Sequence, residues 1–321
     1  MTSPPELTVV IPTYDRPAEI RRCLEALAAS EDVVLERIEV VVVDDGTPGD
    51  ILRPQLERLV AAVPFRLTVL RQDNAGQASA RNAAMAVARG PLWLFLNDDT
   101  LACPTLLTAH LRAHADHPDE AIGCLGRMTL APGIPWTAAR SLHLDHMWSR
   151  LAGRSELKWF HFWTTNVSLK AAFLRRHRLA FDPAIRYVHD DVELGRRLHA
   201  HGFRLLYHPE ALGYHDHALT ESDFLRMAER EAASLCDWAV RQPDAVPELA
   251  RFGYTPARAR WERAIKYPAL AVVFNRVTLP AWRRLARAAW PVWPAGARLL
   301  LSQCYAAVKR RGISRARRPA S

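Results

Sequence analysis

Two stretches of the sequence decide the fold, VVVVDDG at residues 40–46 and LWLFLNDD at residues 92–99. Each is a continuous apolar run, rich in β-branched or aromatic residues and closed by turn formers, which is typical of a buried strand in a parallel sheet. Ligands bind outside the carboxyl ends of such strands, so the two acidic pairs indicate a site for a divalent cation and a phosphorylated ligand. The alternative is that each Asp-Asp pair only caps a turn.

Around these stretches, strands and helices alternate through the first hundred residues. Strands are expected at 6–11, 38–43, 66–71 and 92–96, and helices at 15–29, 50–63 and 77–89. The first helix is marked by Asp15, a candidate N-cap, and by Pro17 in its first turn. This order predicts an α/β fold with a Rossmann-like, mostly parallel sheet that helices flank.

Several common catalytic motifs are absent from the sequence. No Gly-x-Gly-x-x-Gly follows the first strand, and neither a P-loop nor a Gly-x-Ser-x-Gly elbow occurs, so these motifs do not explain the phosphate site. His110 and His114 lie four residues apart on an expected helix. The glutamate that a zinc protease would place between them is missing, so we expect both on a solvent-exposed helical face.

Length and cysteine content bound the class of protein. A chain of 321 residues predicts one large domain with an appendage, or two domains. Its five cysteines are widely spaced and include no Cys-x-x-Cys, which argues against a disulfide framework or a zinc knuckle and favours a reducing cytosol. The first seven residues lack the basic and apolar regions of a signal peptide, so we expect a cytoplasmic protein.

Positive charge is concentrated near the C-terminus. Residues 253–321 contain fifteen Lys and Arg against one acid, Glu262, whereas residues 1–252 carry a net charge of −5. The overall charge of +9 is therefore a property of the last part of the chain. Such an asymmetry predicts an attachment surface for a polyanion, either anionic lipid or nucleic acid.

The same region has an amphipathic pattern. From residue 279 onward, one side of the expected helix carries Trp282, Ala286, Trp290 and Trp293, and the other carries Arg283, Arg284 and Arg287. A helix of this kind lies well in a membrane interface, and each nearby basic residue adds about 1 kcal/mol of attraction to anionic lipid. The charge-free stretches are too short for a spanning helix. The alternative is a helical cap that packs on the catalytic domain.

The motifs together resemble those of family 2 glycosyltransferases, which have the GT-A fold. The first half of the resemblance comprises VVIPTYDR (9–16), VDDGT (43–47), NAGQ (74–77), ARN (80–82) and NDD (97–99). The second half comprises TNVS (165–168), FD (181–182), DDVELGRRL (190–198), Gly202 and YH (214–215). The resemblance implies a catalytic domain at 1–218, with a nucleotide-binding half at 1–100 and an acceptor half at 101–218. Residues 219–321 would then form a helical, basic C-terminal region.

The resemblance implies a site for a nucleoside diphosphate sugar. Its residues would be Pro12, Thr13, Tyr14, Arg16, Asp44, Asp45, Gly76, Arg81, Asn97 and Asp98. Tyr14 would stack on the base, and Asp44 would accept the imide N–H of uracil or thymine, so the donor is expected to be a UDP- or dTDP-sugar. Core packing is the alternative for Tyr14, and a surface ion pair is the alternative for Arg81.

A divalent cation would offset the charge that the leaving diphosphate gains as the glycosidic bond breaks. Mg²⁺ or Mn²⁺ suits hard oxygen ligands. The resemblance implies that Asp99 binds the metal and that Asp98 assists, although Asn97 opens the triplet where the family has an acid. His215 would complete the metal shell, with His217 as a neighbouring candidate, and an imidazole ligand would favour Mn²⁺.

Asp191 is the expected catalytic base. In an inverting displacement, a carboxylate takes the proton of the acceptor hydroxyl as that hydroxyl attacks the anomeric carbon. Asp190 stands where the family has glutamate, and it would orient the acceptor or bind a main-chain donor. It is also a candidate N-cap that forms a capping box with Glu193. Asn166 would lie near the donor or acceptor sugar.

These expectations describe a metal-dependent inverting glycosyltransferase that acts in the cytoplasm, held peripherally at the inner face of a membrane. The acceptor would be a glycan, such as a cell envelope polysaccharide, or a lipid-linked or small-molecule hydroxyl compound. A sugar nucleotidyltransferase is the enzymatic alternative, but no Gly-rich Arg/Lys signature follows the first strand. Nucleic-acid binding through the basic tail is the alternative from another class, and we expect no nucleic-acid partner.

Overall fold

The computed structural model describes residues 4–49, 51–254 and 265–316, which form two compact units. The first unit comprises residues 1–134, 148–186 and 190–217. The second comprises residues 135–147, 187–189 and 218–321. Two short segments from within the expected catalytic region therefore belong to the second, helical unit.

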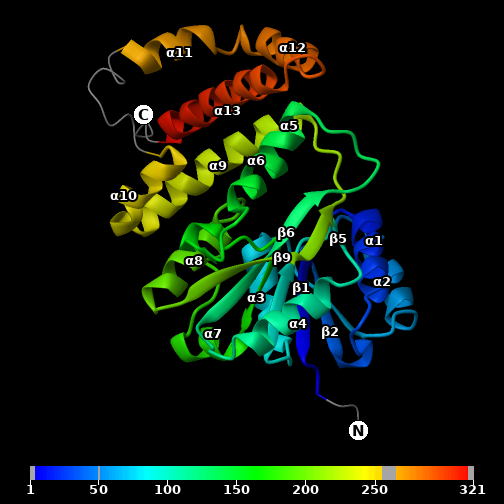
Figure 1. The fold of residues 1–321 in the computed structure, drawn as a ribbon. Helices are drawn as coiled ribbons and strands as arrows, with labels where there is room; N and C mark the ends of the chain where they lie inside the picture. The colour runs from blue at the N-terminus through cyan, green and yellow to red at the C-terminus, as the bar shows by residue number, and fades with distance from the viewer. Residues whose placement is uncertain (1–3, 50, 255–264, 317–321) are drawn as a thin grey trace. The chain divides into compact units, whose positions relative to one another are not determined.

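The first unit is built on one mixed sheet (Figure 1). Its strands are β1 (Leu7–Thr13), β2 (Ile38–Asp44), β3 (Arg66–Arg71), β4 (Leu92–Leu96), β5 (Thr100–Ala102), β6 (Ile122–Leu130), β7 (Glu156–Leu157), β8 (Asn166–Lys170) and β9 (Arg204–His215). Their order is β3-β2-β1-β4-β8-β6-β9-β5, and β7 pairs with β9. The first four strands are parallel, as predicted, while β8 runs antiparallel to both β4 and β6.

The helices of the first unit pack around this sheet. They are α1 (Pro17–Ala28), α2 (Leu52–Val60), α3 (Gln77–Val87), α4 (Leu106–Asp116), α7 (Ala171–His177) and α8 (Asp190–Ala200). The alternation predicted for residues 6–96 is present element by element. The expected N-cap is wrong, because the cap position belongs to Arg16. Asp15 instead has a φ of 52°, and its main-chain N–H donates to Thr47.

The apolar runs that decided the fold form the core of the sheet. The side chains of Val40, Val41, Val42 and Val43 are all 0% exposed, and Leu94 to Leu96 are equally buried. A strand of a parallel sheet has both faces covered, so consecutive rather than alternate residues must be apolar. Burial on both faces fixes where β2 and β4 end, and therefore where the acidic residues that follow them begin.

His110 and His114 are buried, so the predicted solvent-exposed face is wrong. His110 is 0% exposed and His114 is 7% exposed, because α4 packs against β6 and β9. Both rings lie within 2.8 Å of the Ser168 hydroxyl oxygen, through His110 Nδ1 and His114 Nε2. The sequence holds a signal for this burial, since the two histidines share a helical face with Leu107, also 0% exposed.

The second unit is helical. Its helices are α5 (Ala138–Arg140), α9 (Glu221–Arg241), α10 (Val246–Leu249), α11 (Tyr267–Val273), α12 (Leu279–Ala289) and α13 (Pro294–Ala316), and α6 (His146–Trp148) lies where the chain returns to the first unit. A core cluster formed mainly by α9, α12 and α13 holds this unit together. None of the helices in the described part of the chain has the length and apolar composition that crossing a bilayer requires.

Only part of the predicted tryptophan face lies free, since Trp293 is 59% exposed. Trp282 and Trp290 pack against the core of the helical unit. On the opposite side, Arg283 donates to the Ser222 hydroxyl at 2.7 Å, and Arg287 pairs with Glu221 at 2.9 Å. The buried part of the amphipathic pattern therefore reflects packing within the unit, because α13 offers an apolar surface that the sequence of α12 alone does not reveal.

Candidate active site

The acidic pairs that follow β2 and β4 meet at one edge of the sheet. Thr13, the last residue of β1, lies opposite Asp44, the last residue of β2. The Thr13 hydroxyl also donates to Asp98 Oδ2 at 2.8 Å, directly beyond β4. The parallel strands β1, β2 and β4 thus all end at the same edge of the sheet. Pro12 lies half-buried within β1. Tyr14, which follows β1, is 45% exposed, which excludes core packing for its ring.

Asp98 and Asp99 share one cationic partner. Arg16 Nη1 lies 3.1 Å from Asp98 Oδ1 and 2.7 Å from Asp99 Oδ2. Burial, together with the charge of Asp99, raises the pKa of Asp98 to about 7 against the opposing effect of Arg16. Burial alone would also raise the pKa of Asp99, but the charges of His215 and Arg16 outweigh it and the pKa is lowered. The positive charge of Arg16 and His215 therefore offsets the repulsion between the adjacent buried carboxyl groups of Asp98 and Asp99.

Asp99 also lies beside His215. The antiparallel pairing of β5 with β9 sets Thr100 opposite His215, and His215 Nε2 is 3.6 Å from Asp99 Oδ2. The other oxygen, Asp99 Oδ1, is buried and has no hydrogen-bond partner among the described residues. A buried carboxylate oxygen without a donor is costly unless a ligand satisfies it.

This pair of residues fits a cation that is shared with a substrate. A carboxylate and an imidazole suit Mn²⁺, and such ions are commonly held by one or two protein ligands together with phosphate oxygens. Within the described ranges, no group of three or more His, Cys, Asp or Glu residues could hold a metal on its own. Asp99 and His215 would therefore hold the ion only jointly with a diphosphate.

Asp44 and Asp45 organise the loops after β2. Asp44 Oδ2 accepts from Arg71 at 2.9 Å, and Asp44 Oδ1 accepts from the Thr47 main-chain N–H at 2.9 Å. The carboxylate of Asp45 accepts from the main-chain N–H groups of Ala75 and Gly76, at 2.9 and 2.8 Å. Asp45 thus holds the loop that leads into α3, and its contact with a nucleotide remains a prediction.

Gly76 is required where the loop enters α3. Its φ is 93°, in the left-handed region that favours glycine. A Cβ at this position would lie 3.2 Å from the carbonyl oxygen of Arg186. The loop therefore turns tightly against the segment that precedes α8, and only glycine fits without strain.

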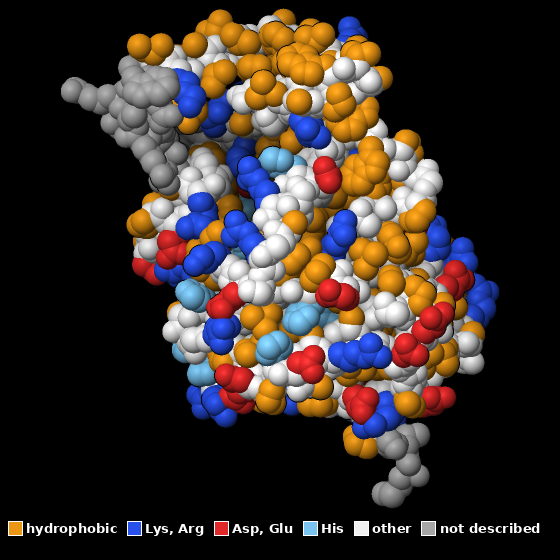
Figure 2. All heavy atoms as spheres, viewed as in Figure 1, with side chains coloured by type: hydrophobic (Ala, Val, Ile, Leu, Met, Phe, Trp, Pro, Cys, Tyr) orange, Lys and Arg blue, Asp and Glu red, His pale blue; other side chains and the backbone are white. Residues whose placement is uncertain are grey.

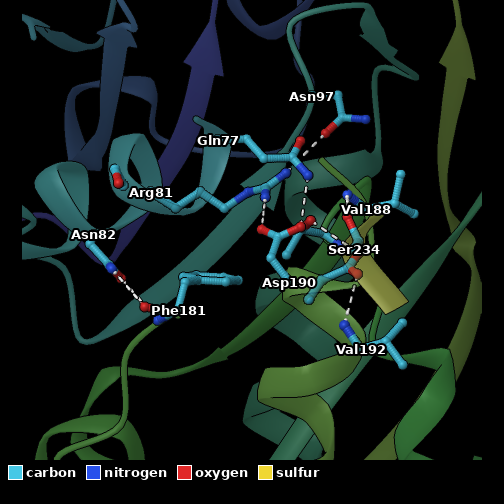
Figure 3. Close-up of polar contacts among 12 residues, drawn as sticks. Gln77, Arg81, Asn82, Asn97, Phe181, Val188, Asp190, Val192 and Ser234 are labelled. Carbon is cyan, nitrogen blue, oxygen red and sulfur yellow. Dashed lines mark hydrogen bonds and ion pairs between the residues drawn. The ribbon is translucent and has the colours of Figure 1, made fainter. Parts of the chain in front are cut away.

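Arg81 and Asp190 form a buried ion pair (Figure 3). Arg81 is 1% exposed, and its Nη1 lies 2.7 Å from Asp190 Oδ2. Gln77 Nε2, one turn earlier on α3, donates to Asp190 Oδ1 at 2.7 Å, and Arg81 Nη2 reaches Asn97 Oδ1 at 3.5 Å. Burial raises the pKa of Asp190 to about 6, although Arg81 opposes this effect. The sequence did not reveal that Gln77 belongs to this group.

These contacts correct two expectations. The guanidinium of Arg81 is enclosed and paired, so in this structure it is not available to a base or a pyrophosphate, nor is its ion pair on the surface. Asp190 is 0% exposed with a partner on each oxygen, so it is not free to orient an acceptor. Both residues instead join α3 to the start of α8.

Asp191 is held differently from its neighbour. Its Oδ2 accepts from the main-chain N–H of Thr164 at 3.0 Å and from the Thr164 hydroxyl at 3.3 Å. Its Oδ1 accepts from the Val192 main-chain N–H at 2.7 Å. Asp191 is half-buried, so its carboxylate is fixed in direction without being enclosed. Thr164 was missed by the sequence reasoning, although it directly precedes the TNVS motif.

Asn166 has a structural role in this structure. It is 0% exposed, and its amide nitrogen donates to the carbonyl groups of Ala211 and Arg127, at 2.8 and 3.2 Å. Its carbonyl oxygen lies 2.9 Å from His110 Nε2. These bonds tie β8 to β6, β9 and α4, and the expected sugar contact is not open to a side chain that is fully enclosed.

The geometry thus groups most of the predicted residues around one sheet edge. The sequence model of the family described as Glycosyl transferase family 2 matches residues 8–179, more than half of the chain.

The chain belongs to glycosyl transferase family 2. Validoxylamine A glucosyltransferase of Streptomyces hygroscopicus subsp. jinggangensis is 32% identical to it over 284 residues, covering 76% of this chain and 63% of that protein. Succinoglycan biosynthesis protein ExoO of Rhizobium meliloti is 30% identical over 269 residues, covering 77% of this chain and 71% of that protein. The match thus spans less than two thirds of the length of the glucosyltransferase.

Solved structures of this kind share the fold. A mannosyltransferase of Pyrobaculum calidifontis, solved in complex with GDP-Man and Mn²⁺, has a TM-score of 0.66 at 20% identity, covering 99% of this chain and 89% of that one. The TarS 1–349 structure of S. aureus with UDP-GlcNAc has a TM-score of 0.52 at 16% identity, covering 95% and 90%. The mixed sheet of the first unit is therefore the expected GT-A fold.

Proposed function

We propose that this protein transfers a sugar from a nucleoside diphosphate sugar to a hydroxyl group, with inversion and with the help of Mn²⁺ or Mg²⁺. The observation that carries the proposal is Asp99, a buried carboxylate whose Oδ1 has no hydrogen-bond partner among the described residues and whose Oδ2 lies 3.6 Å from His215. A relative named as a glucosyltransferase and a fold relative solved with GDP-Man and Mn²⁺ support it.

On the donor side, Asp99 and His215 would hold the cation together with the diphosphate. The bound cation supplies positive charge to the diphosphate as it leaves. Asp98 keeps Arg16 and Thr13 in place beside this position, through bonds of 3.1 and 2.8 Å. Arg16 is partly exposed, with 37% of its side chain accessible, so its guanidinium can contact a diphosphate that arrives at the sheet edge.

The base of the nucleotide would lie between Tyr14 and Asp44. Tyr14 presents an exposed ring directly after β1, which is suitable for stacking. Asp44 ends β2 in register with Thr13, but it is 2% exposed and its two oxygens accept from Arg71 and from the Thr47 main chain. The imide N–H of uracil or thymine would therefore have to displace the Arg71 contact, and the proposal of a UDP- or dTDP-sugar includes this exchange.

On the acceptor side, Asp191 would take the proton of the attacking hydroxyl. The Thr164 and Val192 donors fix its carboxylate, so the group meets the acceptor in one orientation. The Arg81–Asp190 pair anchors the residue immediately before it. The acceptor would be a glycan, a lipid-linked sugar or a small hydroxyl compound, met in the cytoplasm or at the inner membrane face.

The test is a panel of UDP-, dTDP- and GDP-sugars incubated with Mn²⁺, with Mg²⁺ or with a chelator. We expect hydrolysis or transfer from at least one donor, and loss of that turnover in the chelator. The Asp99→Ala variant should lose the Mn²⁺-dependent part of donor affinity measured by calorimetry, whereas Glu36→Ala, an exposed acid outside the site, should keep it. No turnover and no binding of any donor would overturn the proposal.

A further inference from the structure

A cavity of 680 Å³ lies within the helical unit between α11 and α13. Four arginines line it, Arg276, Arg310, Arg311 and Arg315, and we call it the arginine cavity. None of its lining residues is acidic. The aromatic rings of Tyr267 and Phe274 complete its wall.

The positive charge of the four arginines is only partly opposed, by the Glu229 carboxylate near Arg311. No ion pair joins any of them to an acid among the described residues, although Arg311 donates to the Phe274 carbonyl at 3.0 Å. Arg310 Nη2 is buried without a hydrogen-bond partner in the same part of the chain. Burial lowers the pKa of Arg311, and the charge of Arg276 lowers it further against the opposing charge of Glu229. Crowded cations with unused donors provide the hydrogen-bonding geometry that a phosphate group requires.

Acidic charge is scarce around the arginine cavity in the described part of the chain. Residues 265–316 contain ten Lys and Arg and no Asp or Glu. A neighbouring cavity of 570 Å³, which Arg276, Arg311 and Arg315 also line, includes one carboxylate, Glu229. One carboxylate does not balance four arginines, so positive charge is left for a ligand to neutralise.

Exposed apolar side chains gather in the same unit. Among the described residues, 17 large apolar side chains are exposed, and eight of them fall within residues 265–299. We call these eight the apolar face: Ile265, Val272, Val273, Val277, Leu285, Val292, Trp293 and Leu299. Figure 2 shows hydrophobic side chains concentrated over α11 and α12. Single exposed apolar residues are ordinary, but such a concentration marks an interaction surface.

We infer that the arginine cavity and the apolar face together form a docking surface for an anionic lipid bilayer. The phosphate of a lipid headgroup would bind the arginines, while the apolar side chains enter the boundary between headgroups and acyl chains. Val277 belongs to both features, because it lines the cavity and is 87% exposed. The surface differs from the one that the sequence suggested, since Trp282 and Trp290 are used inside the unit.

The combination of positive charge and exposed apolar side chains favours an anionic lipid bilayer over other partners. A second copy of the chain would bring one set of unpaired arginines against another. A nucleic acid would neutralise the arginines but would leave the apolar face in water. Only an amphiphilic, anionic surface satisfies both. This inference does not rest on the proposed sugar transfer, and its test does not measure turnover.

The test is flotation of the full chain with vesicles of phosphatidylcholine alone or mixed with phosphatidylglycerol. We expect binding only to the mixed vesicles. The double variant Arg276→Gln, Arg315→Gln should bind them about 30-fold more weakly, which corresponds to ~1 kcal/mol per basic residue. A charge-matched control, Arg53→Gln with Arg58→Gln on α2, should bind like the unaltered protein.

Two further experiments test the apolar side chains and the source of the phosphate group. Val272→Ser with Val277→Ser should weaken vesicle binding several-fold, whereas Val240→Ser, equally exposed at 79% but on α9, should not. Excess inorganic phosphate should leave the protein on the vesicles, which distinguishes a lipid headgroup from free phosphate. Equal loss in the α2 control, binding unaffected by the arginine variant, or binding to RNA without binding to vesicles would overturn the inference. Circular dichroism would verify that each variant is folded.

Discussion

Asp190 and Asp191 are neighbours in the chain, yet they meet different surroundings. Asp190 is enclosed by Gln77 and Arg81, while Asp191 is half-buried and receives its hydrogen bonds from main-chain N–H groups and one hydroxyl. This difference supports the proposal that Asp191, rather than Asp190, meets the acceptor. Asp190 contributes to stability instead, through its buried ion pair with Arg81.

Replacing Asp191 should reduce transfer, whereas replacing Asp190 should reduce stability. Asp191→Asn should lower transfer by about 10²–10⁴-fold, because an amide cannot take a proton, while donor affinity is retained. Asp190→Asn should instead lower the free energy of unfolding by roughly 3 kcal/mol, because it leaves the charge of Arg81 buried and unpaired. Transfer assays, calorimetry with the donor and urea unfolding would check both. Full transfer by Asp191→Asn would remove this residue from the proposed role.

At the scale of elements, α4 and β8 are joined by a buried polar cluster. The Ser168 hydroxyl oxygen lies 2.8 Å from His110 Nδ1 and from His114 Nε2. The side-chain oxygen of Asn166 lies 2.9 Å from the other ring nitrogen of His110, Nε2. Burial lowers the pKa of His110 to about 4 and that of His114 to about 3, and the charge of Lys170 adds to the effect at His114. His208 also faces this cluster and lowers both values.

These shifts predict a dependence of stability on pH. In the unfolded chain a histidine titrates near pH ~6.5, so below that pH the unfolded state binds more protons than the folded one. The contribution of the buried histidines to the free energy of unfolding is therefore complete above pH ~6.5, and it declines as pH falls toward about 4. Urea unfolding at pH ~7, ~6 and ~5 should show this decline, and it should be smaller in His114→Gln. His199→Gln, an exposed control, should follow the unaltered protein. Parallel curves for all three proteins would contradict the assignment.

At the scale of the whole molecule, the chain forms two units, and the helical one includes residues 187–189 immediately before α8. Within this unit, the carboxylate of Glu231 on α9 accepts from Tyr305 Oη at 2.7 Å and from Lys309 Nζ at 3.1 Å, and it lies 3.1 Å from His189 Nε2. His189 has a φ of 71°, a strained value for this residue type that such contacts can sustain. Glu231 thus links α9, α13 and the chain that leads to Asp191.

Removing the charge of Glu231 should weaken this unit. Burial alone would raise the pKa of Glu231, but the hydrogen bond from His189 and the charge of Lys309 lower it to about 2. Its contribution to stability is therefore complete above pH ~4.3 and is lost as pH falls toward about 2. Glu231→Gln should lower the free energy of unfolding at neutral pH by roughly 3 kcal/mol, and Glu229→Gln, exposed on the same helix, should change it little. Equal urea midpoints for the two variants would contradict this role.

The sequence by itself determined the order of strands and helices through β4 and the place of the acidic pairs. Periodicity, turn formers and continuous apolar runs are local signals, and burial on both faces of a parallel sheet leaves its mark in consecutive residues such as Val40–Val43. The tertiary structure alone decided which polar residues are enclosed. Arg81 and Asp190 are 109 positions apart, and the tryptophans of α12 meet a surface supplied by other helices. Pairing and burial depend on what other segments place against a side chain, and a local pattern carries no record of those partners.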